Sequence, residues 1–84
     1  MRLKEDCRII SLRGHHLLTT GEKSLEVNQS FAKIWKIAAA ESFSTESLTG
    51  KVMLEYDITK SEAEREVTNL IDIWRNHNLL EDND

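Results

Sequence analysis

The last third of the sequence has the apolar spacing of one amphipathic helix, expected over residues 61–77. Its apolar residues recur at intervals of three and four, which places all of them on one helical face. These residues are Ala63, Val67, Leu70, Ile71 and Trp74. Trp74 is therefore expected in the core. Ile73 falls outside this stripe, beside Glu66, Asn69 and His77, and either widens the buried face or forms the floor of a groove.

The ends of this helix are also marked in the sequence. Ser61 is predicted to cap the first turn, because Glu64 follows three residues later and can reach back to it. Asn78 tolerates left-handed backbone and is expected to end the helix, so that Leu79 and Leu80 fold back on the core. This helical half contains no catalytic pattern of side chains. It favours a binding module.

Composition limits the remaining possibilities. The chain has 84 residues, enough for one small domain, and its single cysteine suits a reducing compartment. No apolar run approaches the roughly 20 residues needed to cross a bilayer. The first residues are charged and lack the apolar segment of a signal peptide. We therefore expect a single domain over residues 1–84 that is located in the cytoplasm and does not bind membranes.

The first third of the chain is predicted to form strands over residues 7–12, 15–20 and 24–28. These segments are rich in β-branched and aliphatic residues and are separated by short turns that contain Gly14 and Gly21. They predict a three-stranded antiparallel meander. Its last strand is short and polar on one side, as edge strands commonly are.

Three helices are expected to follow, over residues 29–41, 46–56 and 61–77. Asn28 is a suitable N-cap for the first helix, which carries Phe31, Ile34, Trp35 and Ala38 on one face. Gly50 lies inside the second helix, at a cost of about 1 kcal/mol relative to alanine. The order β-β-β-α-α-α predicts an α+β fold that is winged-helix-like.

Side chains that could carry chemistry are few. His15 and His16 are adjacent in a predicted strand and point to opposite faces, so they do not suit one metal ion. Cys7 has no organised histidine partner in the sequence and is expected to be a small core residue. The three glycines form no phosphate-binding loop. We expect no enzyme activity, no cofactor and no metal.

Several segments resemble members of the PqqD-like family. The passage Ser24–Trp35 is similar to the family's strand followed by Asn-x-Ser/Thr and Ile-Trp, and Glu55–Ile58 is similar to its Glu-Tyr-Asp-Val turn. Glu62–Val67 and Asn78–Glu81 also match, with Asn78 in place of the family's usual glycine. The similarity extends over residues 7–81.

The resemblance implies a winged-helix domain that serves as a recognition element for ribosomally made, post-translationally modified peptides. Such domains bind the leader segment of a precursor peptide and present it to a modifying enzyme, often a radical S-adenosylmethionine protein. In the family the leader adds as a strand beside the third β-strand and lies against the third helix. The expected peptide-binding residues are therefore Ser24, Leu25, Glu26 and Val27 on the strand and Asn69, Leu70, Ile73 and His77 on the helix.

Two other functions are compatible with the predicted fold. A winged helix that binds DNA needs a basic recognition helix, but the last helix carries Glu62, Glu64, Glu66 and Asp72 against Arg65 and Arg75. The whole chain also has a net charge of −4, so we expect no nucleic-acid partner. A structural adaptor could instead dimerise through its edge strand. We expect a monomer or a weak homodimer.

Overall fold

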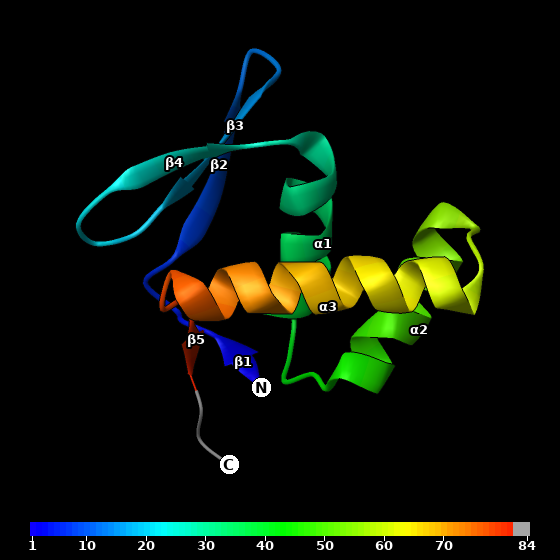
Figure 1. Ribbon diagram of the computed structural model, residues 1–84. Helices are drawn as coiled ribbons and strands as arrows, with labels where there is room; N and C mark the ends of the chain where they lie inside the picture. The colour runs from blue at the N-terminus through cyan, green and yellow to red at the C-terminus, as the bar shows by residue number, and fades with distance from the viewer. Residues whose placement is uncertain (82–84) are drawn as a thin grey trace.

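The computed structural model describes residues 1–81 and contains two small antiparallel sheets and three helices (Figure 1). In chain order the elements are β1 (Arg2–Leu3), β2 (Arg8–Leu12), β3 (His15–Thr19), β4 (Ser24–Val27), α1 (Gln29–Ala39), α2 (Thr45–Tyr56), α3 (Lys60–Asn76) and β5 (Leu80–Glu81). Strands β2, β3 and β4 form the predicted meander, in that order. The α+β, winged-helix-like fold expected from the sequence is confirmed.

The meander is fixed by a tight turn and by alternation of its side chains. Arg13 and Gly14 connect β2 to β3, both with positive φ, of 52° and 80°. A two-residue turn of this kind matches the twist of the strands that it joins. Leu18, in the central strand, is fully buried, and Ile9 and Leu25 lie opposite it in the register on the same face of the sheet. That face packs on the helices.

Helix α1 begins as predicted but ends earlier. Asn28 is its N-cap, because the Asn28 side chain accepts a hydrogen bond of 2.8 Å from the Phe31 N–H. The helix ends at Ala39 rather than at residue 41, and the chain turns so that Phe43 is buried. The Phe43 N–H donates to the Met1 carbonyl at 2.7 Å, which anchors this turn to the start of the chain.

Helix α2 begins at Thr45, one residue before the predicted start, and continues through Gly50. Ser44 is its N-cap and forms a reciprocal pair of hydrogen bonds with Ser47, which satisfies two free N–H groups of the first turn. Asp57, with φ of 52°, ends the helix.

The predicted cap of α3 was wrong. The N-cap is Thr59, whose hydroxyl accepts a hydrogen bond of 3.2 Å from the Glu62 N–H, and Ser61 lies inside the helix. Both positions have a hydroxyl residue followed by Glu at the third residue. Only a cap at Thr59 places the apolar Ile58 before the cap and Ala63 at the fourth helical position, the arrangement of a hydrophobic staple. Ile58 packs against the core and Ala63 is part of it.

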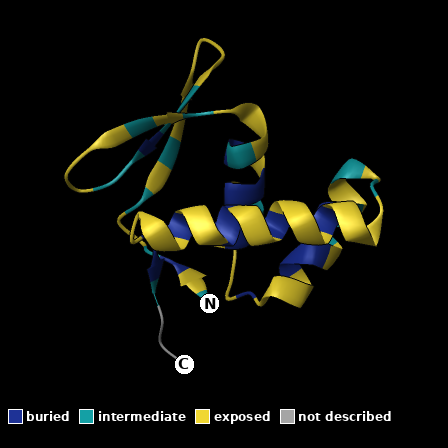
Figure 2. Ribbon diagram, viewed as in Figure 1, coloured by how far each residue is buried: buried dark blue, intermediate teal, exposed yellow. Residues whose placement is uncertain are grey.

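The core is centred on Trp74, which is fully buried as predicted. Figure 2 shows buried stretches that recur along α3 between exposed ones. The Trp74 ring makes edge contacts with Phe31, Trp35 and Phe43, at centroid distances of 6.3, 5.5 and 5.9 Å. Trp35 is buried as well. Helices α1 and α3 and the segment before α2 therefore meet around one aromatic cluster.

The chain turns back after α3 as predicted. It then forms a short strand, β5, that was not predicted. Asn78 has φ of 59°, and the Leu79 N–H donates to the Trp74 carbonyl at 2.8 Å, so the chain reverses there. Leu79 and Leu80 are buried. Strand β5 pairs with β1, with Leu3 opposite Leu80, and this two-stranded sheet was not predicted.

Candidate peptide-binding site

Strand β4 forms one edge of the three-stranded sheet, so one side of its backbone has no partner strand among residues 1–81. Pairs of facing residues in an antiparallel ladder alternate between hydrogen-bonded and non-hydrogen-bonded. The Thr20 N–H donates to the Lys23 carbonyl at 2.8 Å, which makes this pair a bonded one. Counted along the register from this pair, Leu25 and Val27 are the residues of β4 whose backbone N–H and C=O groups bond to β3. The N–H groups of Ser24 and Glu26 therefore point outward.

The side chains of β4 alternate as the sequence predicts. Ser24 and Glu26 are exposed, whereas Leu25 and Val27 are half-buried on the face toward the helices. The Glu26 carboxylate lies 3.1 Å from His15 Nδ1 on the outer face of the sheet. The Glu26 side chain therefore projects from the outer face of the sheet, whereas its N–H points outward in the plane of the sheet.

In the view of Figure 1, the C-terminal part of α3 lies below β4, and the two elements run in opposite directions. At its C-terminal end, His77 and the turn at residues 20–23 line one cavity of about 400 Å³. At its N-terminal end, Glu66 and Ser30, which lies three residues after β4, line another cavity of about 280 Å³. One end of the flank of α3 that extends from Glu66 to His77 therefore lies beside the turn before β4, and the other end lies beside the first turn of α1.

Three of the four predicted helix residues lie on the surface of this flank. Asn69 and His77 are exposed, and Ile73 is 41% exposed despite its apolar side chain. Of the two alternatives left by the sequence, Ile73 does not widen the buried face. Leu70 differs, because it is only 6% exposed and belongs to the core, so it offers little surface to a ligand.

Phe31 is a further candidate that the sequence analysis assigned only to the buried face of α1. It is half-buried, and its ring stacks on Trp35 at a centroid distance of 6.1 Å and meets Trp74 edge-on. The first turn of α1 directly follows β4, which brings this ring to the end of the strand. In the sequence, Phe31 belongs to the same apolar stripe as Ala38, two turns further along α1. Nothing in that pattern indicates that Phe31 is partly exposed.

The two histidines of β3 do not form a common site. His15 contacts Glu26, whereas His16 Nδ1 lies 2.7 Å from the Ser11 hydroxyl, so the two histidines use opposite faces as predicted. In residues 1–81 no three side chains of the types His, Cys, Asp and Glu are grouped so as to hold a metal ion.

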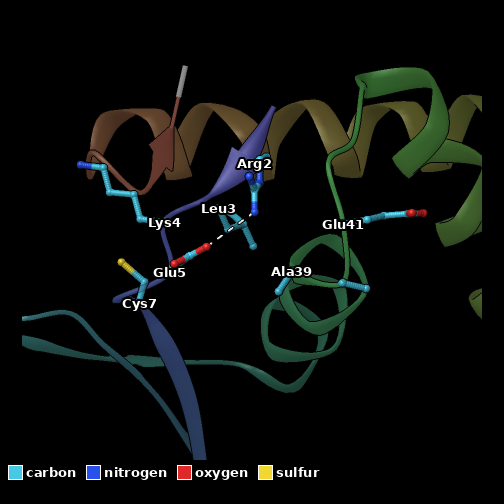
Figure 3. Close-up of a pocket in the computed structure, with 8 residues that line it drawn as sticks. Arg2, Leu3, Lys4, Glu5, Cys7, Ala39 and Glu41 are labelled. Carbon is cyan, nitrogen blue, oxygen red and sulfur yellow. Dashed lines mark ion pairs between the residues drawn. The ribbon is translucent and has the colours of Figure 1, made fainter. Parts of the chain in front are cut away.

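Cys7 is half-buried and lines a cavity of about 290 Å³ between β1 and the end of α1 (Figure 3). Arg2 Nη2 and Glu5 Oε1 form an ion pair of 3.6 Å there. Cys7 also lines the cavity of about 400 Å³ at the C-terminal end of α3, together with His77. Burial, together with the neighbouring Asp6, raises the pKa of the Cys7 thiol. The reactive thiolate is therefore less populated at neutral pH than in a free cysteine.

The family model for coenzyme PQQ synthesis protein D (PqqD) matches residues 14–80, which include the β3–β4 hairpin and all three helices. The chain belongs to the PqqD family. This membership confirms the resemblance noted in the sequence. The match begins after β2 and ends at Leu80, so it contains every residue of the β4 edge and of the α3 flank.

Among solved structures, the PqqD-family chain is similar to TbiB1 in complex with the TbiA(beta) leader peptide, with a TM-score of 0.75. The likeness covers 96% of this chain and 95% of TbiB1, at 17% sequence identity. It therefore extends over nearly the whole fold. No curated protein sequence matches the chain. No helix in residues 1–81 has the length and apolar character needed to cross a membrane.

Proposed function

We propose that this protein binds the leader segment of a ribosomally made precursor peptide by β-strand addition and presents it to a modifying enzyme. A radical S-adenosylmethionine protein is the first candidate for that enzyme. The observation that carries the proposal is the edge of β4, where the N–H groups of Ser24 and Glu26 point outward beside the Glu66–His77 flank of α3. Family membership and the likeness to a leader-peptide complex support it.

The physical basis is the set of unpaired backbone groups on β4. A peptide strand satisfies these groups with its own N–H and C=O, and this binding depends little on peptide sequence. Selectivity then comes from side chains that contact the flanking surface. Ile73 and Phe31 supply apolar surface there, and Asn69 and His77 supply polar groups. The role proposed for the protein is binding without catalysis, in the cytoplasm.

The two alternative functions make different predictions at the same surface. A DNA-binding domain would have to place α3 against phosphates, but this helix carries four acidic residues against three basic ones. An adaptor would pair β4 with β4 of a second copy. No contact or charge in residues 1–81 specifically favours either function.

The proposal can be tested with peptides selected from a displayed library of precursor leader sequences, measured by isothermal titration against the whole chain. We expect binding that is weakened about five- to 150-fold in Glu26→Pro and retained in Glu26→Ala, because only proline removes the backbone donor. Duplex DNA titrated at low and high salt, and sedimentation of the protein alone, complete the experiment. Steeply salt-dependent DNA binding without peptide binding, or a stable dimer lost in Glu26→Pro, would overturn the proposal.

A further inference from the structure

Strand β2 forms the second edge of the three-stranded sheet, on the side opposite β4. In a central antiparallel strand, successive residues bond alternately to the strand on either side. Because Leu18 bonds to β4, its neighbour Leu17 bonds to Ile10 of β2. The N–H groups of Ile9 and Ser11, on either side of Ile10, therefore point away from the sheet, where no strand pairs with β2 among residues 1–81.

The outer face of β2 exposes aliphatic side chains. Ile10 is 48% exposed and Leu12 is 65% exposed. In the view of Figure 1, the turn between β2 and β3 projects beyond the helices, and Figure 2 shows this end of the hairpin as exposed. Edge strands are commonly protected by lysine, by proline or by a bulge. Strand β2 has neither lysine nor proline, and its register with β3 is unbroken over residues 8–12, so it favours pairing with a further strand.

The charge around β2 is positive. Residues 7–21 contain Arg8 and Arg13 but no Asp or Glu, in a chain whose net charge is −4. Arg8 and Lys36 line a cavity of about 330 Å³ between β2 and α1, and no acidic residue among residues 1–81 lines it. Arg8, Arg13 and Lys36 form no ion pair within the described part of the chain. Glu26, on the outer face of the sheet, already contacts His15. The β2 edge therefore complements an acidic partner.

We propose that β2 pairs with an extended, acidic segment of the modifying enzyme, an inference that rests on the proposed function for the identity of this partner. A protein that presents a peptide has to hold the enzyme at a place that the peptide leaves free. Neighbouring strands lie about 4.8 Å apart, so the β2 and β4 edges are about 10 Å apart and face opposite directions. A leader peptide on β4 and the enzyme on β2 can therefore be bound at the same time.

The side chains of β2 determine what this segment contains. Facing residues of an antiparallel pair project from the same face of the sheet and contact each other. The segment therefore carries apolar residues opposite Leu12 and Ile10, and Asp or Glu opposite Arg8. Because it runs antiparallel to β2, its sequence from the N-terminus is apolar-x-apolar-x-acidic, where x is any residue.

A second copy of this chain fits the β2 edge less well. In an antiparallel pair of two β2 strands centred on Ile10, Arg8 of one copy faces Leu12 of the other. Arg8 of each copy then lies beside Arg13 of the other, and like charges in such positions destabilise the pair. Contact between β2 and an acidic surface elsewhere on a second copy would join unlike surfaces, which produces open chains unless the rotation closes a ring.

The test selects short peptides from a displayed random library on the Glu26→Pro chain, in which the β4 edge lacks one of its outward donors. We expect the enriched peptides to share the order apolar-x-apolar-x-acidic. A selected peptide, here called the β2 peptide, is then titrated against the whole chain. Its Kd should be the same for the wild type and Glu26→Pro, and should not change when the wild type is saturated with a leader peptide.

The backbone of β2 is tested by proline. Ser11→Pro removes an outward N–H and should weaken binding of the β2 peptide about five- to 150-fold. Ser11→Ala is the control for the hydroxyl group, which lies 2.7 Å from His16 Nδ1, and should bind as the wild type does. A leader peptide should bind wild type and Ser11→Pro equally.

The side chains of β2 are tested at exposed positions. Arg8→Gln should weaken binding of the β2 peptide about two- to fivefold at low salt. Arg65→Gln, at an exposed position of α3, is the matched control and should have no effect. Leu12→Ala should weaken binding about three- to tenfold, whereas Leu54→Ala, at an exposed position of α2, should not.

The outcomes separate the two proposals. Selected peptides without the acidic and apolar pattern, or equal affinity of the β2 peptide for wild type and folded Ser11→Pro, overturn the inference and leave binding at β4 intact. A dimer of the protein alone that dissociates in Ser11→Pro also overturns it, because a second copy is then the partner of β2. If no leader peptide depends on the β4 backbone, the proposed function fails, and with it the identity of the partner. Melting temperatures show whether a loss reflects unfolding, and if Ser11→Pro unfolds, Arg8→Gln and Leu12→Ala decide.

Discussion

The alternation of backbone groups along β4 predicts different effects of proline at neighbouring positions. Ser24 and Glu26 have outward N–H groups, so Ser24→Pro and Glu26→Pro should leave the sheet intact. Leu25 and Val27 donate inward to β3. Proline at either of these two positions removes a ladder hydrogen bond and leaves a β3 carbonyl without its donor.

The expected magnitudes follow from these lost hydrogen bonds. Leaving one buried carbonyl unsatisfied costs about 1–3 kcal/mol, so Leu25→Pro and Val27→Pro should lower the melting temperature by at least about 4 °C in a domain of this size. In Glu26→Pro the lost hydrogen bond is one between β4 and the bound peptide. The complex is therefore destabilised, and the free protein is not. Affinity should decrease about five- to 150-fold while the melting temperature changes little.

Thermal unfolding followed by circular dichroism, and then isothermal titration of the folded variants with a selected leader peptide, measures both quantities. Leu25→Ala, Glu26→Ala and Val27→Ala are the controls that separate loss of a side chain from loss of an N–H. The reverse pattern, with Glu26→Pro unfolded and Leu25→Pro stable, would refute the register. Normal affinity in folded proline variants at Ser24 and Glu26 would refute binding at this edge.

Two further predictions concern stability. Trp74→Ala removes a fully buried ring that three other aromatic rings contact. The variant should lose about 3–5 kcal/mol of stability, which lowers the melting temperature by at least about 12 °C. An unchanged melting temperature would contradict the central position of Trp74. Thr59→Ala should lower the free energy of unfolding by about 0.5–2 kcal/mol through loss of the α3 cap, whereas Ser61→Ala should change it by less than about 0.5 kcal/mol. Denaturant titration measures both values. The opposite order would show that Ser61 is the cap.

The parts of the fold that follow from local patterns could be predicted from the sequence. Periodicity placed Trp74 in the core, and the tolerance of Asn78 for left-handed backbone located the end of α3. The cap of α3 was ambiguous because Thr59 and Ser61 have the same local pattern. The deciding residue, Ile58, acts through its contact with the core. Strands β1 and β5, of two residues each, are too short for any period to indicate them.

The candidate site shows the same division between local and tertiary information. Helical spacing was enough to place Asn69, Ile73 and His77 on one flank, because that depends on α3 alone. The proximity of this flank to β4 depends on how α1 and α3 cross at the aromatic cluster. For that reason the acidic cavity at Glu66, and the partial exposure of Phe31, could not be derived from the sequence.

Ile73 provides a test of whether this flank contacts the peptide. Because its side chain is 41% exposed, Ile73→Ala should reduce stability by only about 1 kcal/mol. Leu54→Ala is a matched control, since Leu54 is 88% exposed on α2. Removal of this exposed leucine should change neither the melting temperature nor peptide binding.

If an apolar side chain of the leader packs on Ile73, Ile73→Ala should weaken binding by about 1–2 kcal/mol, which corresponds to about five- to thirtyfold in Kd. Ile73→Asp should nearly abolish binding, because the peptide would cover an unpaired carboxylate. Titration of the folded variants with a selected leader peptide measures these effects. A large fall in melting temperature with unaltered affinity would instead make Ile73 a structural residue, and the apolar contact of the peptide would then have to lie at Phe31, nearer the end of β4.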